Sequence, residues 1–276
     1  MGSEEDLMTA SPPGAPRKSV TERAFAVLMS FDITHRRMTL SQISRRTGLP
    51  VATTFRLLDR LESMAAVERG GDGRYSIGPK IWELGILAPT HDVIGMGTRP
   101  LLVRLAARSG AMIRVFVYNG QNALCVEEVL AHGGSSAGGG PGLTLPLQDC
   151  AAGQVIMTSL TPAVRSSLPL TRIQFDRLEE TLAVVHRQGW ARLVRPDGAV
   201  EYAVGLGAEG RPAMALSAAV PPPSGSTKPL VTAEALVPEL RSVARTLVGI
   251  LNNSSDDRHS TAAPPETQPH TNSEHR

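Results

Sequence analysis

The sequence contains little cysteine and no long apolar run, and both absences narrow the class of protein. Cys125 and Cys150 are its two cysteines, and they lack the spacing of a metal site or a redox pair. Both are expected to be plain buried or half-buried thiols. Apolar residues make up 41% of the chain, but the longest apolar runs fall far short of the ~20 residues that cross a bilayer. No membrane partner is therefore expected.

The start of the chain also lacks the features of a secretory signal. Residues 1–19 are acidic and contain proline before any apolar block, whereas export requires a basic start followed by a hydrophobic stretch. A cytoplasmic protein is therefore expected. The segments 1–17 and 252–276 contain almost no large apolar residue and are predicted to be disordered tails. The histidines of the second tail are irregularly spaced, and no metal site is predicted there.

Catalytic motifs are missing as well. We find no Ser/His/Asp or Cys/His constellation and no paired-carboxylate motif. The glycines of Gly138–Gly142 do not stand between a strand and a helix, as a phosphate-binding loop must. An enzyme in the second half of the chain is the first alternative, and the missing motifs argue against it. No cofactor is predicted.

The basic charge of the chain is concentrated in one segment. The formal net charge is only +2, yet between Arg17 and Lys80 twelve basic residues stand against six acidic ones, a local excess of +6. Attraction to DNA requires such an excess, because neutralising phosphates supplies the sequence-independent part of DNA affinity. A solvated basic face without a partner has the same composition and remains the alternative.

The same segment shows the pattern of short helices. Apolar residues recur at helical spacing after Ser19 or Thr21, and either residue can cap a first helix that ends before His35. Thr39 and Gln42 then stand three residues apart, as in a capping box, in which each side chain bonds the backbone of the other residue. A second short helix is therefore expected.

A third helix is predicted from Val51 to Met64. Gly48 suits the left-handed residue that ends the second helix, and Pro50 suits the start of the next one. The predicted apolar stripe of the third helix consists of Phe55, Leu57 or Leu58, Leu61 and Met64. The predicted polar face consists of Thr53, Thr54, Arg56, Asp59 and Arg60.

Two short strand-like runs follow the third helix. Val67–Arg69 and Arg74–Ile77 are joined by Gly70–Gly73, whose residues tolerate positive φ and favour a hairpin. Tyr75 is expected in the hairpin core. Three helices and a basic hairpin describe a winged helix-turn-helix over residues 18–78.

A winged helix-turn-helix reads double-stranded DNA with the N-terminal residues of its third helix. Arg56 is the strongest candidate, because a guanidinium can bind guanine in bidentate fashion and discriminate by ~1–3 kcal/mol; a solvated arginine is the alternative. Val51 and Ala52 offer only apolar contacts, so DNA shape is expected to carry much of the selectivity. The predicted DNA-binding residues are Arg45, Arg46, Val51, Ala52, Thr53, Thr54, Arg56, Arg69 and Arg74.

Residues 79–98 are predicted to form a linker helix region. One recognition helix covers too few base pairs to select one promoter among ~10⁶ or more sites, so a dimer on two half-sites is expected. The helix over Pro79–Leu87 is the candidate dimer element. Its apolar stripe packing against its own domain is the alternative.

Residues 99–251 alternate between strand and helix patterns and predict a second, α+β domain. Asn119 and Gly120 form a strong turn pair between the first two strands. Gly133–Gly142 is expected to be a loop. The predicted helices are Ile94–Ser109, Ala151–Leu160, Gln174–Gln188 and Val231–Leu251, and the predicted strands are Met112–Tyr118, Ala123–Val129, Val200–Leu206 and Ala213–Val220.

Several separated motifs resemble those of the isocitrate lyase regulator (IclR) family. They are Ser19–Ala24, Leu49–Leu58, Arg74–Gly78, Leu145–Gln154 and Val185–Trp190. The resemblance implies a winged helix-turn-helix, a linker helix and a GAF/PAS-like effector-binding domain. It also implies a homodimer or tetramer, and a repressor controlled by a small metabolite.

The resemblance also places an effector site at Gln148, Ala151 and Ala152. The family's usual lysine after Gly153 is Gln154 here, and Val200 stands where a late strand commonly contributes a cysteine. Fewer polar groups are available to fix an anionic ligand. A regulator with a degenerate pocket, acting constitutively or through a protein partner, is therefore the second alternative. A cavity with convergent polar groups within residues 133–154 would distinguish the two.

Overall fold

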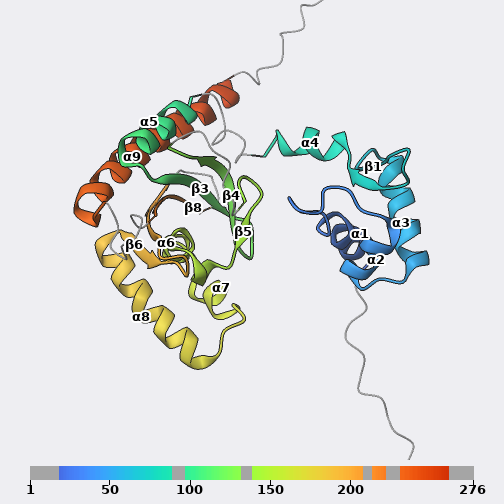
Figure 1. The fold of residues 1–276 in the computed structure, drawn as a ribbon, viewed down its shortest axis with the longest axis horizontal. Helices are drawn as coiled ribbons and strands as arrows, with labels where there is room; N and C mark the ends of the chain where they lie inside the picture. The colour runs from blue at the N-terminus through green and yellow to red at the C-terminus, as the bar shows by residue number, and fades with distance from the viewer. Residues whose placement is uncertain (1–18, 89–96, 132–138, 208–212, 222–230, 261–276) are drawn as a thin grey trace, which may run out of the picture. The chain divides into compact units, whose positions relative to one another are not determined.

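The structure is a computed structural model that describes residues 19–88, 97–131, 139–207, 213–221 and 231–260, with side chains of the last helix described as far as Asn252. The chain divides into two compact units after Leu87, and each unit is described by itself (Figure 1). The predicted tail 1–17, the end of the second tail, part of the linker region and most of the glycine-rich loop lie outside the described residues.

The first unit is a winged helix-turn-helix, which confirms the predicted fold of this segment. Thr39 and Gln42 form the predicted capping box, and Gly48 ends the second helix with φ 68°. Ser19, rather than Thr21, caps the first helix, together with Glu22. The elements are α1 (Val20–Leu28), α2 (Leu40–Thr47), α3 (Val51–Ser63), β1 (Val67–Arg69), β2 (Tyr75–Ile77) and α4 (Pro79–Gly85).

The core of this unit lies between α1, α2, α3 and the hairpin. Tyr75 is buried, as predicted, and its backbone exchanges two hydrogen bonds with Met38 at 2.7 and 2.9 Å. Phe55 and Met64 were predicted to face this core, and that prediction was wrong, since both are about half exposed. The buried residues of α3 are Thr54, Leu57, Leu58 and Leu61.

The second unit is built on one antiparallel sheet of six strands in the order β5-β4-β3-β8-β7-β6. The first hairpin has the predicted bounds, and its turn is closed by Asn119, whose side chain accepts from the backbone of Gln121 and Asn122. Trp190–Val194, an edge strand, was not predicted. The strands are β3 (Met112–Tyr118), β4 (Ala123–Val129), β5 (Thr144–Leu145), β6 (Trp190–Val194), β7 (Val200–Gly205) and β8 (Met214–Val220).

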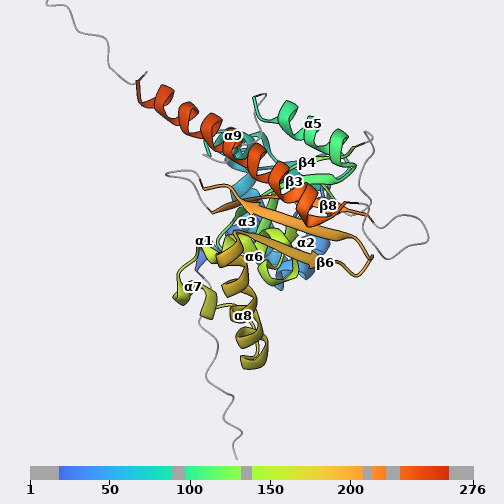
Figure 2. The ribbon, with the colours of Figure 1, turned by 90° about the vertical axis from the view of Figure 1, so that its left-hand side faces the viewer.

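Helices cover both faces of this sheet (Figures 1 and 2). On one face lie α5 (Arg99–Ser109) and α9 (Ala233–Ser260), and on the other lie α6 (Ala151–Thr158) and α8 (Arg172–Gln188). The 3-10 helix η2 (Leu147–Asp149) leads into α6, and α7 (Pro162–Ser166) follows it. Because strand side chains alternate, the sheet separates two cores, and the predicted α+β class is confirmed.

The last helix corrects one predicted boundary. A disordered tail was predicted from residue 252, but α9 continues to Ser260. Its first turns are amphipathic and pack on the sheet through residues such as Leu240 and Leu247. Once a helix is nucleated by such packing, adding further residues costs little, so polar residues can extend it.

Both cysteines are free and buried, as predicted. Burial raises the pKa of each thiol to about 12, so neither is a reactive thiolate near neutral pH. Among the described residues, no helix is long and apolar enough to cross a membrane. The same residues contain no group of three or more potential metal ligands.

Candidate nucleic-acid interface

A charged turn between α1 and α2 positions the helix-turn-helix. The Asp32 carboxylate accepts hydrogen bonds from the backbone of Thr34 and His35, both at 2.8 Å. The hydrogen bonds from Thr34 and His35 hold the pKa of Asp32 well below its usual range. Arg46 of α2 closes this turn, since its Nη2 lies 2.6 Å from Asp32 and its Nε donates to the Ser30 carbonyl at 2.9 Å.

The structure therefore assigns Arg46 to the turn, although a phosphate contact was predicted for it. A guanidinium already bound to a carboxylate and a carbonyl gains less from a phosphate than a solvated one does. The adjacent Arg45 is exposed on the helix surface. Arg45 is thus the better candidate of the two for a phosphate contact.

The start of α3 corrects a second predicted contact. Thr54 was predicted to face DNA, but its side chain is fully buried, and its hydroxyl donates to the carbonyl of Pro50 at 3.1 Å. Ser44 of α2 donates to the Leu49 carbonyl at 2.6 Å. These two hydroxyls satisfy backbone carbonyls of the turn that joins the helices. Thr54 therefore fixes α3 relative to α2, and its buried side chain is not presented on the exposed face of α3.

The other predicted residues of α3 form an exposed face. Val51 is 51% exposed and Ala52 is exposed beside it, while Thr53 is half-buried. Arg56 is exposed one turn further along the helix. Residues three and four apart on a helix lie on the same side, so Ala52, Thr53 and Arg56 are presented together.

The hairpin adds a second basic element. The Arg69 guanidinium lies 5.5 Å from the centre of the Tyr75 ring, a distance typical of a cation–π contact. Arg74 lies 3.9 Å from the carboxylate of Asp72 in the turn. Arg37, which was not predicted as a DNA-binding residue, also lies at this hairpin. It donates to Asp72 at 3.2 Å. Asp72 thus partly neutralises the basic hairpin.

The short helix α4 follows the hairpin directly. Gly78 permits this close junction, because a Cβ built there would lie 2.3 Å from the carbonyl oxygen of Ala65. Ile81 packs against the core of the first unit. Trp82, Leu84 and Leu87 are 59–72% exposed. Packing against its own domain therefore accounts for one side of α4 only.

The predicted effector residues lie where η2 meets α6. Gln148 is half-buried, whereas the side chains of Ala151 and Ala152 are fully buried. The Ala151 backbone N–H donates to Oε2 of Glu201 at 3.0 Å. Glu201 was not predicted from the sequence, where its one signal is an acid within the apolar run of β7.

Glu201 belongs to a buried polar group on the α6 side of the sheet. Arg114 of β3 and Glu128 of β4 are bound at 2.7 Å with side chains only 4% and 8% exposed. Ser217 of β8 is paired with Arg114 in the strand register. Burial raises the pKa of Glu201, while the hydrogen bonds from Ala151 and Ser217 act in the opposite direction.

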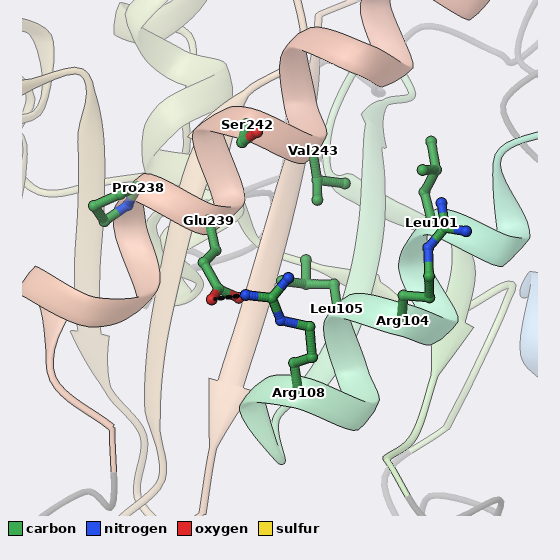
Figure 3. A pocket seen from close by; sticks show the side chains of 8 residues that line it. All are labelled: Leu101, Arg104, Leu105, Arg108, Pro238, Glu239, Ser242 and Val243. Carbon is green, nitrogen blue, oxygen red and sulfur yellow. Dashed lines mark hydrogen bonds and ion pairs between the residues drawn. The ribbon is translucent and has the colours of Figure 1, made fainter.

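A groove on the opposite face of the sheet is a separate feature (Figure 3). It runs between α5 and α9, has a volume of about 380 Å³, and is crossed by the Arg108–Glu239 ion pair at 2.9 Å. None of its lining residues is a predicted effector residue. The residues that line it are Leu101, Arg104, Leu105, Arg108, Pro238, Glu239, Ser242 and Val243.

Comparison with known proteins identifies related chains for both units. The family model of the IclR helix-turn-helix domain matches residues 20–71. The HTH-type transcriptional repressor AllR of Salmonella paratyphi A is 25% identical over 193 residues, which cover 66% of this chain and 71% of the relative. The HTH-type transcriptional regulator XynR of Escherichia coli is 24% identical over 62% of this chain and 72% of its own length.

Solved structures match over most of the chain. An IclR homologue from Microbacterium hydrocarbonoxydans, complexed with 4-hydroxybenzoate, is 26% identical with a TM-score of 0.68, covering 85% of this chain and all of that one. A putative regulator from Silicibacter is 20% identical with a TM-score of 0.71, covering 91% of this chain and all of that one. The second match shows the likeness of fold alone.

Proposed function

Because this chain belongs to the IclR family of transcription regulators, we propose that it is a repressor that binds promoter DNA as a homodimer. Its relatives are DNA-binding regulators, and the chain is a regulator rather than an enzyme. The repressor role is supported by the related AllR proteins, which are described as repressors.

The observation that carries this proposal is the exposed face of α3. Arg56 is placed to bind a base or phosphate, and a bidentate contact with guanine discriminates by about 1–3 kcal/mol. Thr53 is placed for a phosphate or a thymine methyl group, and Val51 and Ala52 for apolar contacts only. Arg45 binds a flanking phosphate in this arrangement.

The hairpin contributes contacts of a second kind. Arg69 is exposed at the end of β1 and Arg74 directly before β2, and both can enter the minor groove or bind the adjacent backbone. Arginines respond there to groove width rather than to individual bases. Few polar side chains on the exposed face of α3 can bind base edges, so DNA shape supplies part of the selectivity.

Helix α4 is the proposed dimer element. Trp82 and Leu84 expose large apolar side chains on α4, in which none of the residues is buried, and Leu87 does so just beyond its end. A second copy of α4 can cover these side chains and bring two recognition helices onto two half-sites.

The second unit has two candidate forms of control. Control by a small-molecule effector near Gln148, Ala151 and Ala152 is supported by the related structure that holds 4-hydroxybenzoate, a small carboxylate. Regulation without a soluble ligand at this site is favoured by one observation: the alanine side chains are fully buried, and the Ala151 N–H is already bound to Glu201. We propose that this site works without a soluble ligand.

DNA binding is tested with the purified full-length protein and fragments of its own genome. Sequencing of the retained fragments defines the site, and fluorescence anisotropy then measures its affinity. We expect Arg56→Ala to lose about tenfold or more, since ~1–3 kcal/mol corresponds to that range. Arg172→Ala is the matched control, because Arg172 is also an exposed helix arginine but lies in the second unit.

Two results would contradict the proposal. If the wild type retains no genomic fragment above scrambled DNA, the protein is not a sequence-specific regulator. If Arg56→Ala binds as tightly and as selectively as the wild type, α3 does not read DNA through Arg56. The repressor role is tested separately, because deletion of the gene must raise transcription from a bound promoter.

A further inference from the structure

A carboxyl group from the sheet occupies the N-terminus of α6. Ala151 is the first residue of this helix, and its N–H donates to Oε2 of Glu201. The first N–H groups of a helix have no partner within the helix and carry a partial positive charge, so they bind carboxylates. Glu201 therefore lies where a bound carboxylate would lie at this helix end.

The strand register brings Glu201 to this position. Glu201 is paired with Ala219, and Ser217 is paired with Ala203, so Glu201 and Ser217 are diagonal neighbours on the α6 side of the sheet. Hydrogen bonding by the Ser217 side chain also lowers the pKa of Glu201. Two donors from different elements thus hold the same buried carboxyl group.

The two arginines whose charges act on Glu201 form their ion pairs with other carboxylates. Arg114 is bound to the Glu128 carboxylate at 2.7 Å and donates to the Gly139 carbonyl at 3.1 Å. The charges of Arg195 and Arg114 lower the pKa of Glu201, but Arg195 is paired with Asp197 at 3.2 Å and Arg114 with Glu128. The Ala151 N–H and the Ser217 side chain remain as the hydrogen-bonding groups of the Glu201 carboxyl. Both can also donate to another carboxylate of similar size.

A second polar residue of α6 is poorly satisfied. Oε1 of Gln154 has no hydrogen-bond partner among the described residues, although Gln154 is only 8% exposed. It lies three residues after Ala151, on the same side of the helix. A buried acceptor without a donor lowers stability, and such groups are expected at binding sites rather than in a core selected for stability alone.

We propose that Glu201 is a built-in ligand, whose carboxyl group fills the carboxylate site at the start of α6 and excludes soluble acids from it. This inference rests on the proposed function for the regulatory role of the second unit. The side chains of Ala151 and Ala152 at this site are fully buried. The wild-type protein therefore does not bind small carboxylates at this site.

The change Glu201→Ala provides the test, because it removes one methylene and one carboxyl group, the atoms that acetate restores. The Tm of the full-length variant is measured in sodium acetate, in sodium chloride at equal ionic strength, and in acetamide as the neutral analogue. We expect acetate at about ten times its Kd to raise the Tm of the variant by about 3–6 °C. Calorimetric titration gives the Kd.

Two comparisons make the result specific. The wild type and Glu180→Ala, which removes an exposed acid of α8, are expected to show no difference between acetate and chloride. The double change Glu201→Ala with Ser217→Ala is expected to bind acetate more weakly than Glu201→Ala alone, because one of the two donors is lost.

Several outcomes would overturn the inference. Equal acetate binding by wild type and Glu201→Ala would show that Glu201 does not fill the site, and a folded variant without acetate binding would show that no such site exists. If the variant is unfolded without ligand, recovery of its circular dichroism by acetate but not acetamide supports the inference, and no recovery contradicts it. Promoter binding by the wild type, measured in parallel, tests the proposed function independently.

Discussion

Nη2 of Arg46 lies 2.6 Å from Oδ2 of Asp32, and this contact distinguishes Arg46 from the adjacent Arg45. Arg46 also binds the Ser30 carbonyl and so joins α2 to the end of α1. Arg45, the preceding residue, is exposed. Adjacent residues on a helix point about 100° apart, so Arg46 can hold the fold while Arg45 stays available for the proposed phosphate contact.

The two arginines therefore provide a matched pair of substitutions. We expect Arg45→Ala to weaken binding to all DNA sequences and to reduce the salt dependence by about one phosphate contact. We expect Arg46→Ala to lower the stability of the first unit by roughly 1 kcal/mol through the lost hydrogen bonds. Anisotropy at several salt concentrations measures the first effect, and hydrogen exchange of residues 19–88 measures the second. Equal losses of stability in both variants would contradict this division of roles.

The Asp32 carboxylate makes the stability of this turn dependent on pH. Its folded-state pKa lies below the ordinary value of 3.8, chiefly because of the Thr34 hydrogen bond. A depressed pKa contributes stability that is present above the unfolded-state pKa and is lost as pH falls toward the folded-state value. We expect Asp32→Asn to be less stable than wild type at neutral pH, and the difference to shrink as pH falls below 3.8.

Thermal melting of both proteins across this pH range is the measurement. Asp176→Asn is the control, because Asp176 is an exposed acid of α8 in the second unit, where it pairs with Arg172. A constant difference between Asp32→Asn and wild type from neutral to acidic pH would contradict the assignment.

Thr53 and Thr54 form a second matched pair at the start of α3. Thr54 is buried and bound to Pro50, so Thr54→Ala is expected to cost about 1–3 kcal/mol of stability, since it removes a buried hydroxyl and leaves a small cavity. Thr53→Ala is expected to leave stability unchanged and to reduce DNA affinity by a few-fold. Melting curves and anisotropy on the same preparations distinguish them. If Thr54→Ala loses more DNA affinity than its loss of stability explains, Thr54 contacts DNA after all.

The features that could be predicted from the sequence depend on local chemistry. The capping box of Thr39 and Gln42, the left-handed Gly48 and the turn at Asn119 each act within a few residues of the chain. These signals are enough to place the helix-turn-helix and the first hairpin of the second unit. Together with the basic excess between Arg17 and Lys80, they predicted the start of α3 as the candidate DNA-binding site.

The errors arise where packing decides between neighbouring residues. Hydrophobicity favoured Phe55 as a core residue over Thr54, but Thr54 completes the spacing of Leu57, Leu58 and Leu61 and has its hydroxyl satisfied by the backbone. Glu201 meets α6 through a contact between residues fifty positions apart, which depends on strand register and has no local signal. Such contacts follow from the assembled sheet only.

The exposed apolar face of α4 predicts how the protein assembles. Trp82 is 68% exposed, and burying an aromatic side chain of this size against a second copy contributes about 1.5–3 kcal/mol. We expect the wild type to sediment as a dimer or a larger multiple, and Trp82→Ser to dissociate at concentrations where the wild type stays associated. Binding to a complete operator is expected to fall at least tenfold, while binding to one half-site is retained, because each recognition helix remains intact.

Ile173→Ser is the control, since Ile173 is equally exposed on α8. If Trp82→Ser sediments and binds the complete operator as the wild type does, dimerisation does not depend on Trp82 of α4, and the two half-sites are brought together by another surface.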